Sequence, residues 1–353
     1  MGRQSQTSGW SIVVAALLLT MYGLSTLLSL DRQLFYQQLV FSFVGIGLFV
    51  LFMRSDFSLY RYLDRYIYGF SIILLLLTFL GPEVRGATRW LEIAGMRLQP
   101  SEFVKPFLIV SWASFLHRYP IDKLRNFFLH LLLIAIPFLL VFEQPDLGNA
   151  IVLFVTWLAM VILSGLPWLV VGVAGLLASL LAPLGYTFLE EYQKQRLMTF
   201  INPLHDPRGA GYNSIQSIIA VGSGQLFGRG FGRGTQTLLR FLPEYHTDFI
   251  FASLSEEFGL VGSVLLLGTF FVLLWQIILH ARRVATDALA FAFMVGMCVM
   301  IATQMIVNVG MNVGLVPITG ITLPLVSYGG SSLLSMWISI GMLLSRVKRE
   351  KNT

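Results

Sequence analysis

The chain has 353 residues, of which 56% are hydrophobic and only 12% are charged, and its mean hydropathy is +0.75. These values exclude a soluble globular domain of this length and are typical of a polytopic membrane protein. A net charge of +6 would suggest nucleic acid as a partner of a soluble protein, but here the basic residues first set topology, and we expect no nucleic-acid partner. The single cysteine, Cys298, excludes an internal disulfide or a cysteine-based metal cluster.

Apolar runs long enough to cross a bilayer, about 20 residues each, recur along nearly the whole sequence. The first run is longer than a signal-peptide core, so we interpret it as a retained span. We predict an all-α membrane bundle forming one domain, 1–353, with a long extracytoplasmic loop, about 187–248, between helices seven and eight. The ten predicted spans are Trp10–Leu30, Leu39–Phe52, Tyr66–Leu80, Glu102–Leu116, Phe127–Val141, Gly148–Ser164, Leu166–Tyr186, Phe249–Leu279, Ala288–Asn308 and Gly330–Leu344.

The distribution of basic residues predicts the orientation of these spans. An even number of spans places both termini on one side, and placing that side in the cytoplasm puts thirteen of the 24 Lys and Arg residues inside. A short external loop is an exception, because it carries Arg85, Arg89 and Arg97. The positive-inside rule disfavours basic residues there, so we expect a functional reason for their position.

The stretch Leu242–Gly262 carries His246, Asp248 and a Glu pair ending at Glu257 into the eighth span. A carboxylate at this boundary meets hydrocarbon, so desolvation raises its pKa and suits it to accept a proton near neutral pH. Asp248 is therefore the candidate catalytic residue, with His246 and Glu257 as supporting residues. The alternative is that Thr247 or Asp248 caps the helix, and the two roles are compatible.

Two external arginines, Arg85 and Arg89, have no adjacent carboxylate in the sequence. Paired guanidinium N–H donors suit phosphate oxygens, so we predict that they bind a phosphate group of the substrate. The alternative is contact with lipid head groups.

The fourth span begins with a polar cluster that contains further candidate substrate-binding residues. Glu102 and Lys105 are three residues apart, so they share a helix face and can neutralise each other in lipid. A purely structural ion pair is the alternative reading. Gln99 and Ser101 precede this pair and are further candidates.

Asp146 lies in the turn EQPDLGNA between the fifth and sixth spans. Ordinary turn chemistry explains an Asp beside Pro and Gly. The alternative is that Asp146 converges with Asp248 in a charge network or on a divalent cation, for which oxygen ligands favour magnesium or manganese. No motif dictates a metal site, so its residues stay unassigned.

The segment from Asn308 to Ser332 is too rich in Gly and Pro to form one helix. Irregular backbone at membrane depth is tolerated where protein or a cavity covers it, so we predict a lined cavity with hydroxyls from Ser327, Tyr328, Ser331 and Ser332. The alternative is that tight turns and helix caps use the same residues. The Gly-rich segment 222–234 lacks a βαβ context, and we expect no nucleotide cofactor.

A stripe of small residues, Ala288, Ala292 and Gly296, recurs every four positions of the ninth span. Such a stripe permits close helix contact, either with a span of the same chain or with the single helix of a partner. Packing within the chain is the favoured reading.

Several motifs together resemble the SEDS family (shape, elongation, division and sporulation). They are RWL and QPSE before a membrane helix, QPDLG, HTDFIF followed by a Glu pair, and the closing GLVPITGITLPLVSYGGSS. The match runs from about Arg85 to the last span, with the motifs in the family's order. Short termini and GMNVGLVPITGITLP make the chain more similar to the elongation branch, RodA, than to the division branch, FtsW.

The resemblance implies a peptidoglycan glycosyltransferase that polymerises lipid II at the outer face of the bacterial cytoplasmic membrane. It implies a class B penicillin-binding protein as partner, contacted through the eighth and ninth spans. The essential carboxylate of the family's HTDF motif is here Asp248. The Glu–Lys pair of the QPSE helix maps onto Glu102 and Lys105, and the Asp of QPDLG onto Asp146.

Two rival functions are compatible with the sequence. A lipid II flippase would also have many spans and a polar cavity, but it should expose polar groups at several depths, whereas the ionisable residues here gather near the outer side. A non-catalytic scaffold of the cell-wall synthesis complex would leave a costly, partly buried carboxylate without a purpose.

Overall fold

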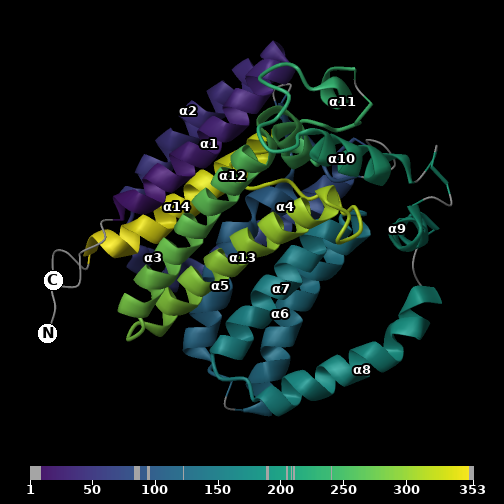
Figure 1. Cartoon of the computed structure of the whole chain (residues 1–353). Helices are drawn as coiled ribbons and strands as arrows, with labels where there is room; N and C mark the ends of the chain where they lie inside the picture. The colour runs from purple at the N-terminus through teal and green to yellow at the C-terminus, as the bar shows by residue number, and fades with distance from the viewer. Residues whose placement is uncertain are drawn as a thin grey trace, which may run out of the picture.

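The computed structural model describes residues 9–82, 88–93, 96–121, 123–187, 191–203, 206, 207, 209, 211–239 and 241–349. Within these residues the fold is a helical bundle (Figure 1). The helices of 14 or more residues are α1 (Trp10–Leu30), α2 (Arg32–Arg54), α3 (Phe57–Leu77), α5 (Lys105–Arg118), α6 (Leu124–Glu143), α7 (Leu147–Leu163), α8 (Trp168–Thr187), α12 (Ile250–Arg283), α13 (Ala288–Asn312) and α14 (Gly330–Arg349).

The chain is a multi-pass membrane protein. In the described part, six helices are long and apolar enough to span a bilayer, and α7 and the first part of α8 are shorter apolar helices. The two remaining long helices, α5 and α14, are largely buried among the others, so they do not need a continuous apolar surface. The predicted all-α bundle of about ten membrane helices is confirmed.

Helix α13 occupies the centre of the bundle, where it packs against α5, α7 and α12. Helix α2 lies along α14, and α1 lies along α12 (Figure 1). Ala292 and Gly296 of the small-residue stripe are buried. A Cβ at Gly296 would lie 2.6 Å from side-chain atoms of Ile109 and Met160. At these two positions the stripe packs within the chain, as predicted, whereas Ala288 is exposed.

The segment between α8 and α12 contains α9 (Glu191–Ile201), α10 (Tyr212–Ser223) and α11 (Thr235–Leu238). Helix α10 packs on α12 and α13. Glu256 of α12 ties α11 to the bundle, because its buried carboxylate accepts hydrogen bonds from the backbone N–H groups of Gln236 (2.9 Å) and Thr237 (3.2 Å).

The Gly-rich segment 222–234 supplies hydrogen-bond partners for the backbone at a break in α12. Gly259 is non-helical, with φ +66° and ψ −162°, so neighbouring backbone groups need other partners inside the membrane. The N–H groups of Arg229 and Gly230 donate to the carbonyls of Glu256 (2.9 Å) and Glu257 (3.1 Å). In the other direction, the N–H groups of residues 260 and 261 donate to the carbonyls of residues 225 and 226.

These reciprocal backbone hydrogen bonds predict a strong effect of adding a methyl group at Gly259. A Cβ there would lie 2.2 Å from the backbone nitrogen of Gly228, and the φ of +66° strains any L-residue. We expect Gly259→Ala to reduce stability by about 1–3 kcal/mol, measured as an earlier thermal transition in detergent. Gly268→Ala is the matched control, since it lies in the same helix with open space at its Cβ. Equal transitions for the two variants would contradict this account.

Two local features differ from the sequence prediction. The loop predicted to be external forms a short antiparallel hairpin of β1 (Leu91–Ile93) and β2 (Met96–Leu98) that places Glu92 opposite Arg97. Four-residue helix α4 (Pro100–Phe103) is separated from α5 by Val104. Periodicity predicts neither feature, because strands of three residues and a break of one residue are shorter than the patterns it detects.

Candidate active site

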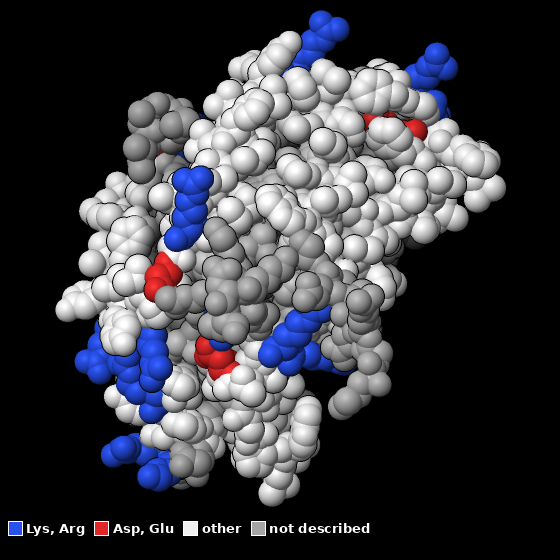
Figure 2. Space-filling view, turned by 90° about the vertical axis from the view of Figure 1, so that its left-hand side faces the viewer, with Lys and Arg blue, Asp and Glu red and all other residues white. Residues whose placement is uncertain are grey.

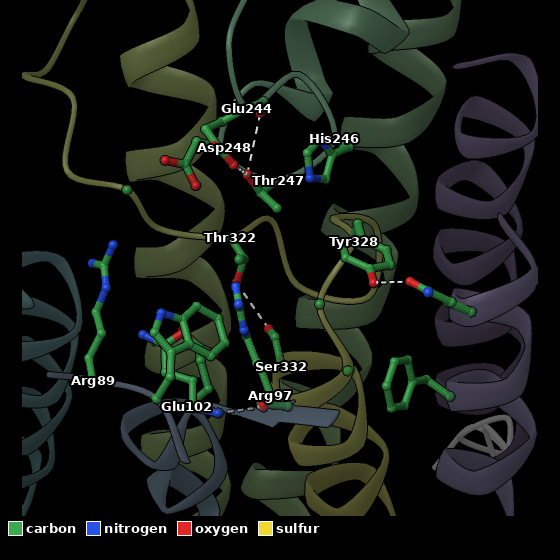
Figure 3. A pocket seen from close by; sticks show the side chains of 18 of the residues that line it. Arg89, Arg97, Glu102, Glu244, His246, Thr247, Asp248, Thr322, Tyr328 and Ser332 are labelled. Atoms are coloured by element: carbon green, nitrogen blue, oxygen red, sulfur yellow. Dashed lines mark hydrogen bonds between the residues drawn. The ribbon is translucent and has the colours of Figure 1, made fainter. Parts of the chain in front are cut away.

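A cavity of about 830 Å³ opens between the hairpin, α2, α4, the loop before α12 and the segment between α13 and α14 (Figure 3). This volume falls in the range of small-molecule sites. Its lining residues are Gln37, Val40, Phe41, Arg89, Trp90, Glu92, Arg97, Gln99, Glu102, Glu244, His246, Thr247, Asp248, Gly320, Thr322, Tyr328, Gly329, Gly330, Ser331 and Ser332. The predicted cavity is therefore present.

Asp248 lies two residues before the start of α12, with part of its surface open to the cavity. The pKa of its carboxyl is raised from an ordinary 3.8 to about 6. Burial is the largest cause and the Glu244 carboxylate adds to it, while Arg89, Arg196 and the Thr247 hydroxyl act in the opposite direction. A carboxylate with this pKa is ionised at neutral pH and is a stronger base than an ordinary Asp, which suits proton abstraction.

The capping alternative for this stretch is wrong. The N-cap position of α12 is Phe249, whose side chain has no hydrogen-bond acceptor. The Thr247 hydroxyl instead contacts the carbonyl and carboxylate of Glu244, at 3.3 and 3.2 Å. Neither Thr247 nor Asp248 caps the helix, and the Asp248 carboxyl faces the cavity.

Arginine side chains stand on the opposite wall of the cavity. Arg89 and Arg97 both line it, and in Figure 3 the Arg89 side chain extends toward the end of the cavity that holds Asp248. Arg85, predicted to act with Arg89, lies outside the described residues. The cavity thus combines a basic carboxylate with guanidinium groups suited to phosphate oxygens.

Glu102 and Lys105 form the predicted ion pair, with Nζ 2.7 Å from Oε1. Both side chains are almost completely buried. Glu102 lines the cavity, whereas Lys105 is not among the described lining residues. The pair therefore couples the cavity wall to the packed interior of α5.

Asp146 does not converge with Asp248. It is buried, caps the N-terminus of α7, and is not among the described residues that line the cavity. Its Oδ2 accepts hydrogen bonds from the side chains of Gln99 (2.8 Å), Ser101 (2.9 Å) and Asn149 (2.9 Å). The turn-chemistry reading is correct, and Asp146 supports the cavity wall through Gln99.

The remaining predicted residues divide between the cavity and its surroundings. His246 lines the cavity, as does Ser331, whose Oγ accepts a hydrogen bond from the Gln99 N–H at 2.7 Å. Ser327 is not among the described lining residues, so the alternative of a turn contact holds for it, whereas Tyr328 and Ser332 line the cavity. Glu257, predicted as a supporting residue, is not among the described lining residues either. Ser327 binds backbone groups, and Glu257 accepts hydrogen bonds from Ser29 and Gly232 near the break in α12.

Several lining residues escaped the sequence interpretation. Arg97 was an exception to the orientation rule but was not assigned to the site. Glu244, four positions before Asp248, was not assigned to it either. Gln37 and Phe41 line the cavity from α2, a helix whose sequence contains no motif that links it to the site.

Comparison with known proteins identifies the family. The sequence matches the family described as cell cycle protein, which groups FtsW, RodA and SpoVE, over residues 8–353. The chain is a SEDS protein. This SEDS protein is 40% identical over 305 residues to the peptidoglycan glycosyltransferase MrdB of Escherichia coli K12, a match that covers 86% of this chain and 82% of MrdB.

Solved structures agree with this assignment. The SEDS protein matches a chain of a peptidoglycan synthase complex, described as coordinating polymerization and crosslinking, with a TM-score of 0.84, 31% identity and coverage of 97% and 98% of the two chains. It matches the RodA crystal structure from Thermus thermophilus with a TM-score of 0.74, 30% identity and 99% coverage of each chain. The SEDS protein is RodA-like, as its closing motif predicted.

Proposed function

We propose that this SEDS protein is a peptidoglycan glycosyltransferase that polymerises lipid II during cell elongation. The observation that carries the proposal is Asp248, a carboxylate with a raised pKa that faces a cavity also lined by Arg89 and Arg97. The named relatives support the reaction class, because MrdB is called a peptidoglycan glycosyltransferase.

The proposed reaction is an inverting glycosyl transfer. Asp248 accepts the proton of the GlcNAc 4-hydroxyl of one lipid-linked disaccharide, and that oxygen bonds to the anomeric carbon of MurNAc in the growing chain. The bond between this carbon and the pyrophosphate oxygen breaks, and undecaprenyl pyrophosphate leaves with the electron pair. Arg89 and Arg97 are placed to stabilise the leaving negative charge.

A divalent cation, magnesium or manganese, is part of the proposal only as a companion of the pyrophosphate. Among the described residues, no group of three or more His, Cys, Asp and Glu side chains could hold a metal alone. Magnesium is commonly held by one or two carboxylates together with substrate phosphates. Glu92 and Glu244, which line the same cavity, are carboxylates that fit this role and leave Asp248 free to act as the base, and the cation would supply charge neutralisation.

The orientation that we propose places this cavity outside the cytoplasm and both termini inside. The cavity lies where α12 begins and α13 ends, so the turn between these helices is at the opposite end of the bundle. Figure 2 looks onto the side that carries this turn, and a dense group of Lys and Arg side chains lies at its lower left. Basic residues concentrated at one end indicate the cytoplasmic side.

A class B penicillin-binding protein is the proposed partner, contacted through the eighth and ninth membrane helices, α12 and α13. Helix α12 presents an exposed apolar face that includes Leu260, Val264, Phe271 and Trp275, and α13 adds Ile306. Ala292 and Gly296 are used inside the bundle, so the face of α12 supports this contact better than the stripe does.

A reconstituted polymerisation assay tests the proposed function. Purified protein is incubated with lipid II in detergent, with and without the partner, and glycan chains are separated by gel electrophoresis. Chains are expected when the partner is present. A flippase would instead move lipid II across vesicle membranes without making chains, and a scaffold would do neither.

The raised pKa of Asp248 predicts the pH dependence of polymerisation. Only the ionised carboxylate accepts a proton, so kcat/KM should fall about tenfold per pH unit below a midpoint near 6 and stay constant above it. Glu244→Gln removes a negative charge that raises this pKa, so the midpoint should move to lower pH. A rate that is flat between pH 5 and 7 would contradict the assignment of Asp248 as the base.

A further inference from the structure

The backbone of Asp248 is held from the central helix α13. Its carbonyl oxygen accepts hydrogen bonds from the side-chain amides of Asn308 and Asn312, each at 3.0 Å. Both asparagines are fully buried, and they lie one turn apart on a helix that is apolar enough to span a membrane. Burying a polar side chain in a membrane helix costs free energy. Two buried amides that donate to the same carbonyl oxygen therefore indicate a specific structural role.

Asn312 also explains why the Asp248 side chain is not needed as a cap for α12. Its Oδ1 accepts a hydrogen bond from the N–H of Ala252, in the first turn of α12, at 3.1 Å. An acceptor for this N–H normally comes from the N-cap side chain, and here that residue is Phe249. The cap is therefore supplied from another helix, and the Asp248 carboxyl can face the cavity.

The two preceding carbonyls of the same loop are held by the segment that follows α13. The Thr247 carbonyl accepts a hydrogen bond from Ser327 Oγ at 2.6 Å, and the His246 carbonyl accepts one from the Tyr328 N–H at 2.9 Å. Ser327 Oγ also accepts from the N–H of Leu323 at 2.8 Å. Three consecutive carbonyls, of residues 246, 247 and 248, are thus fixed by residues 308–328.

The same segment also borders the carboxyl group of Asp248. Gly320 has a φ of +76°, and a Cβ at this position would lie 3.5 Å from Asp248 Oδ2. Asn308 holds Gly320's neighbour, because its amide also donates to the Ile321 carbonyl at 2.7 Å. One asparagine therefore fixes both the backbone of Asp248 and the chain that borders its carboxyl.

We propose that Asn308, Asn312 and Ser327 are positioning residues that hold the Asp248 carboxylate at the reacting sugar hydroxyl. The inference rests on the proposed function. It assigns the irregular segment between α13 and α14 to the support of the base, and not to substrate contact alone. A misplacement of about 1 Å can cost on the order of 100-fold in rate, so the effect should fall on kcat while the KM for lipid II stays nearly unchanged.

Matched variants separate positioning from general destabilisation. Asn308→Leu removes the amide, and Gln304→Leu makes a comparable change one turn earlier on α13, at a residue that is equally buried. Among the hydrogen bonds of the described residues, Gln304 makes none to residues 246–248. We expect Asn308→Leu to lower kcat by about 10- to 100-fold and Gln304→Leu to leave it within about twofold.

A second pair keeps the test decisive if Asn308→Leu does not fold. Ser327→Ala should lower kcat by about tenfold, and Ser327→Thr, which keeps the hydroxyl, should restore most of it. Ser339→Ala is the control, because within the described part of the chain its buried hydroxyl donates only to the Ser335 carbonyl of the same helix, α14, at 2.7 Å. Equal losses in Ser327→Ala and Ser327→Thr, or in Asn308→Leu and Gln304→Leu, would overturn the inference.

Hydrogen exchange gives a readout that does not need activity. In peptides that cover residues 242–252, exchange should be faster in Asn308→Leu and Ser327→Ala than in the wild type and the two controls. Unchanged exchange in these peptides would overturn the positioning role even if the rates fall. If the wild type makes no glycan chains, the proposed function fails. The hydrogen-exchange measurement then still decides whether residues 308–328 hold the loop that carries Asp248.

Discussion

Asp248→Asn is expected to abolish glycan polymerisation while leaving the fold intact. The substitution keeps the shape of the side chain and all contacts of its backbone carbonyl with Asn308 and Asn312. It removes the group that accepts the proton of the sugar hydroxyl, a loss of about 10²- to 10⁴-fold for general base catalysis. Polymerisation of lipid II by the purified variant with its partner, compared with the wild type at equal protein concentration, measures this effect.

Glu143→Gln is the control for the loss of a negative charge. Glu143 is an exposed carboxylate at the end of α6, and it is not among the described residues that line the cavity. Its variant should polymerise lipid II at the wild-type rate. Near-normal activity of Asp248→Asn, with an unchanged thermal transition, would exclude Asp248 as the base and reopen the flippase and scaffold readings.

Local chemistry in the sequence predicted the environment of Asp248, which lines the cavity. Asp248 stands where a polar loop enters an apolar run, and this boundary predicted both its partial burial and the rise in its pKa. The spacing of Glu102 and Lys105 predicted their ion pair for a similarly local reason. Such predictions depend on neighbours within four residues, which the sequence displays directly.

The contacts of distant segments were not predictable in this way. Ser327 carries a hydroxyl that suits a cavity wall, yet its partner is a carbonyl 80 residues away in sequence. Asp146 was also assigned to the site, and it reaches the cavity wall through Gln99, 47 residues away in sequence. Glu257 was predicted as a supporting residue, and its hydrogen bonds run to Ser29 and Gly232. A single sequence gives the chemistry of a side chain, but packing decides which of several suitable partners it meets.

The same distinction applies to the fold. Hydrophobic runs predicted the number of membrane helices, because burying about 20 apolar residues in a bilayer is a property of each run alone. The break at Gly259 lies inside a predicted span, and the backbone groups at the break bond to the Gly-rich segment some 30 residues earlier. A glycine in a membrane helix predicts no break without knowledge of what approaches it.

Lys105→Met is expected to destabilise the protein severely. Its methionine fills the space of the lysine stem but leaves the buried Glu102 carboxylate without its cation, which is 2.7 Å away in the native pair. Removing one partner of a buried ion pair costs about 3–5 kcal/mol, because the other charge stays desolvated. Thermal unfolding in detergent, followed by size-exclusion chromatography of the fraction that remains monodisperse, measures the loss.

A double variant separates this charge effect from lost packing. Adding Glu102→Gln to Lys105→Met removes both charges, so most of the lost stability should return, although Glu102 lines the cavity and activity need not recover. Lys123→Met, at an exposed position before α6, is the control for a lost cation and should unfold like the wild type. If the double variant were no more stable than Lys105→Met, the buried charge would not be the cause, and the aliphatic packing of Lys105 within α5 would have to explain the loss.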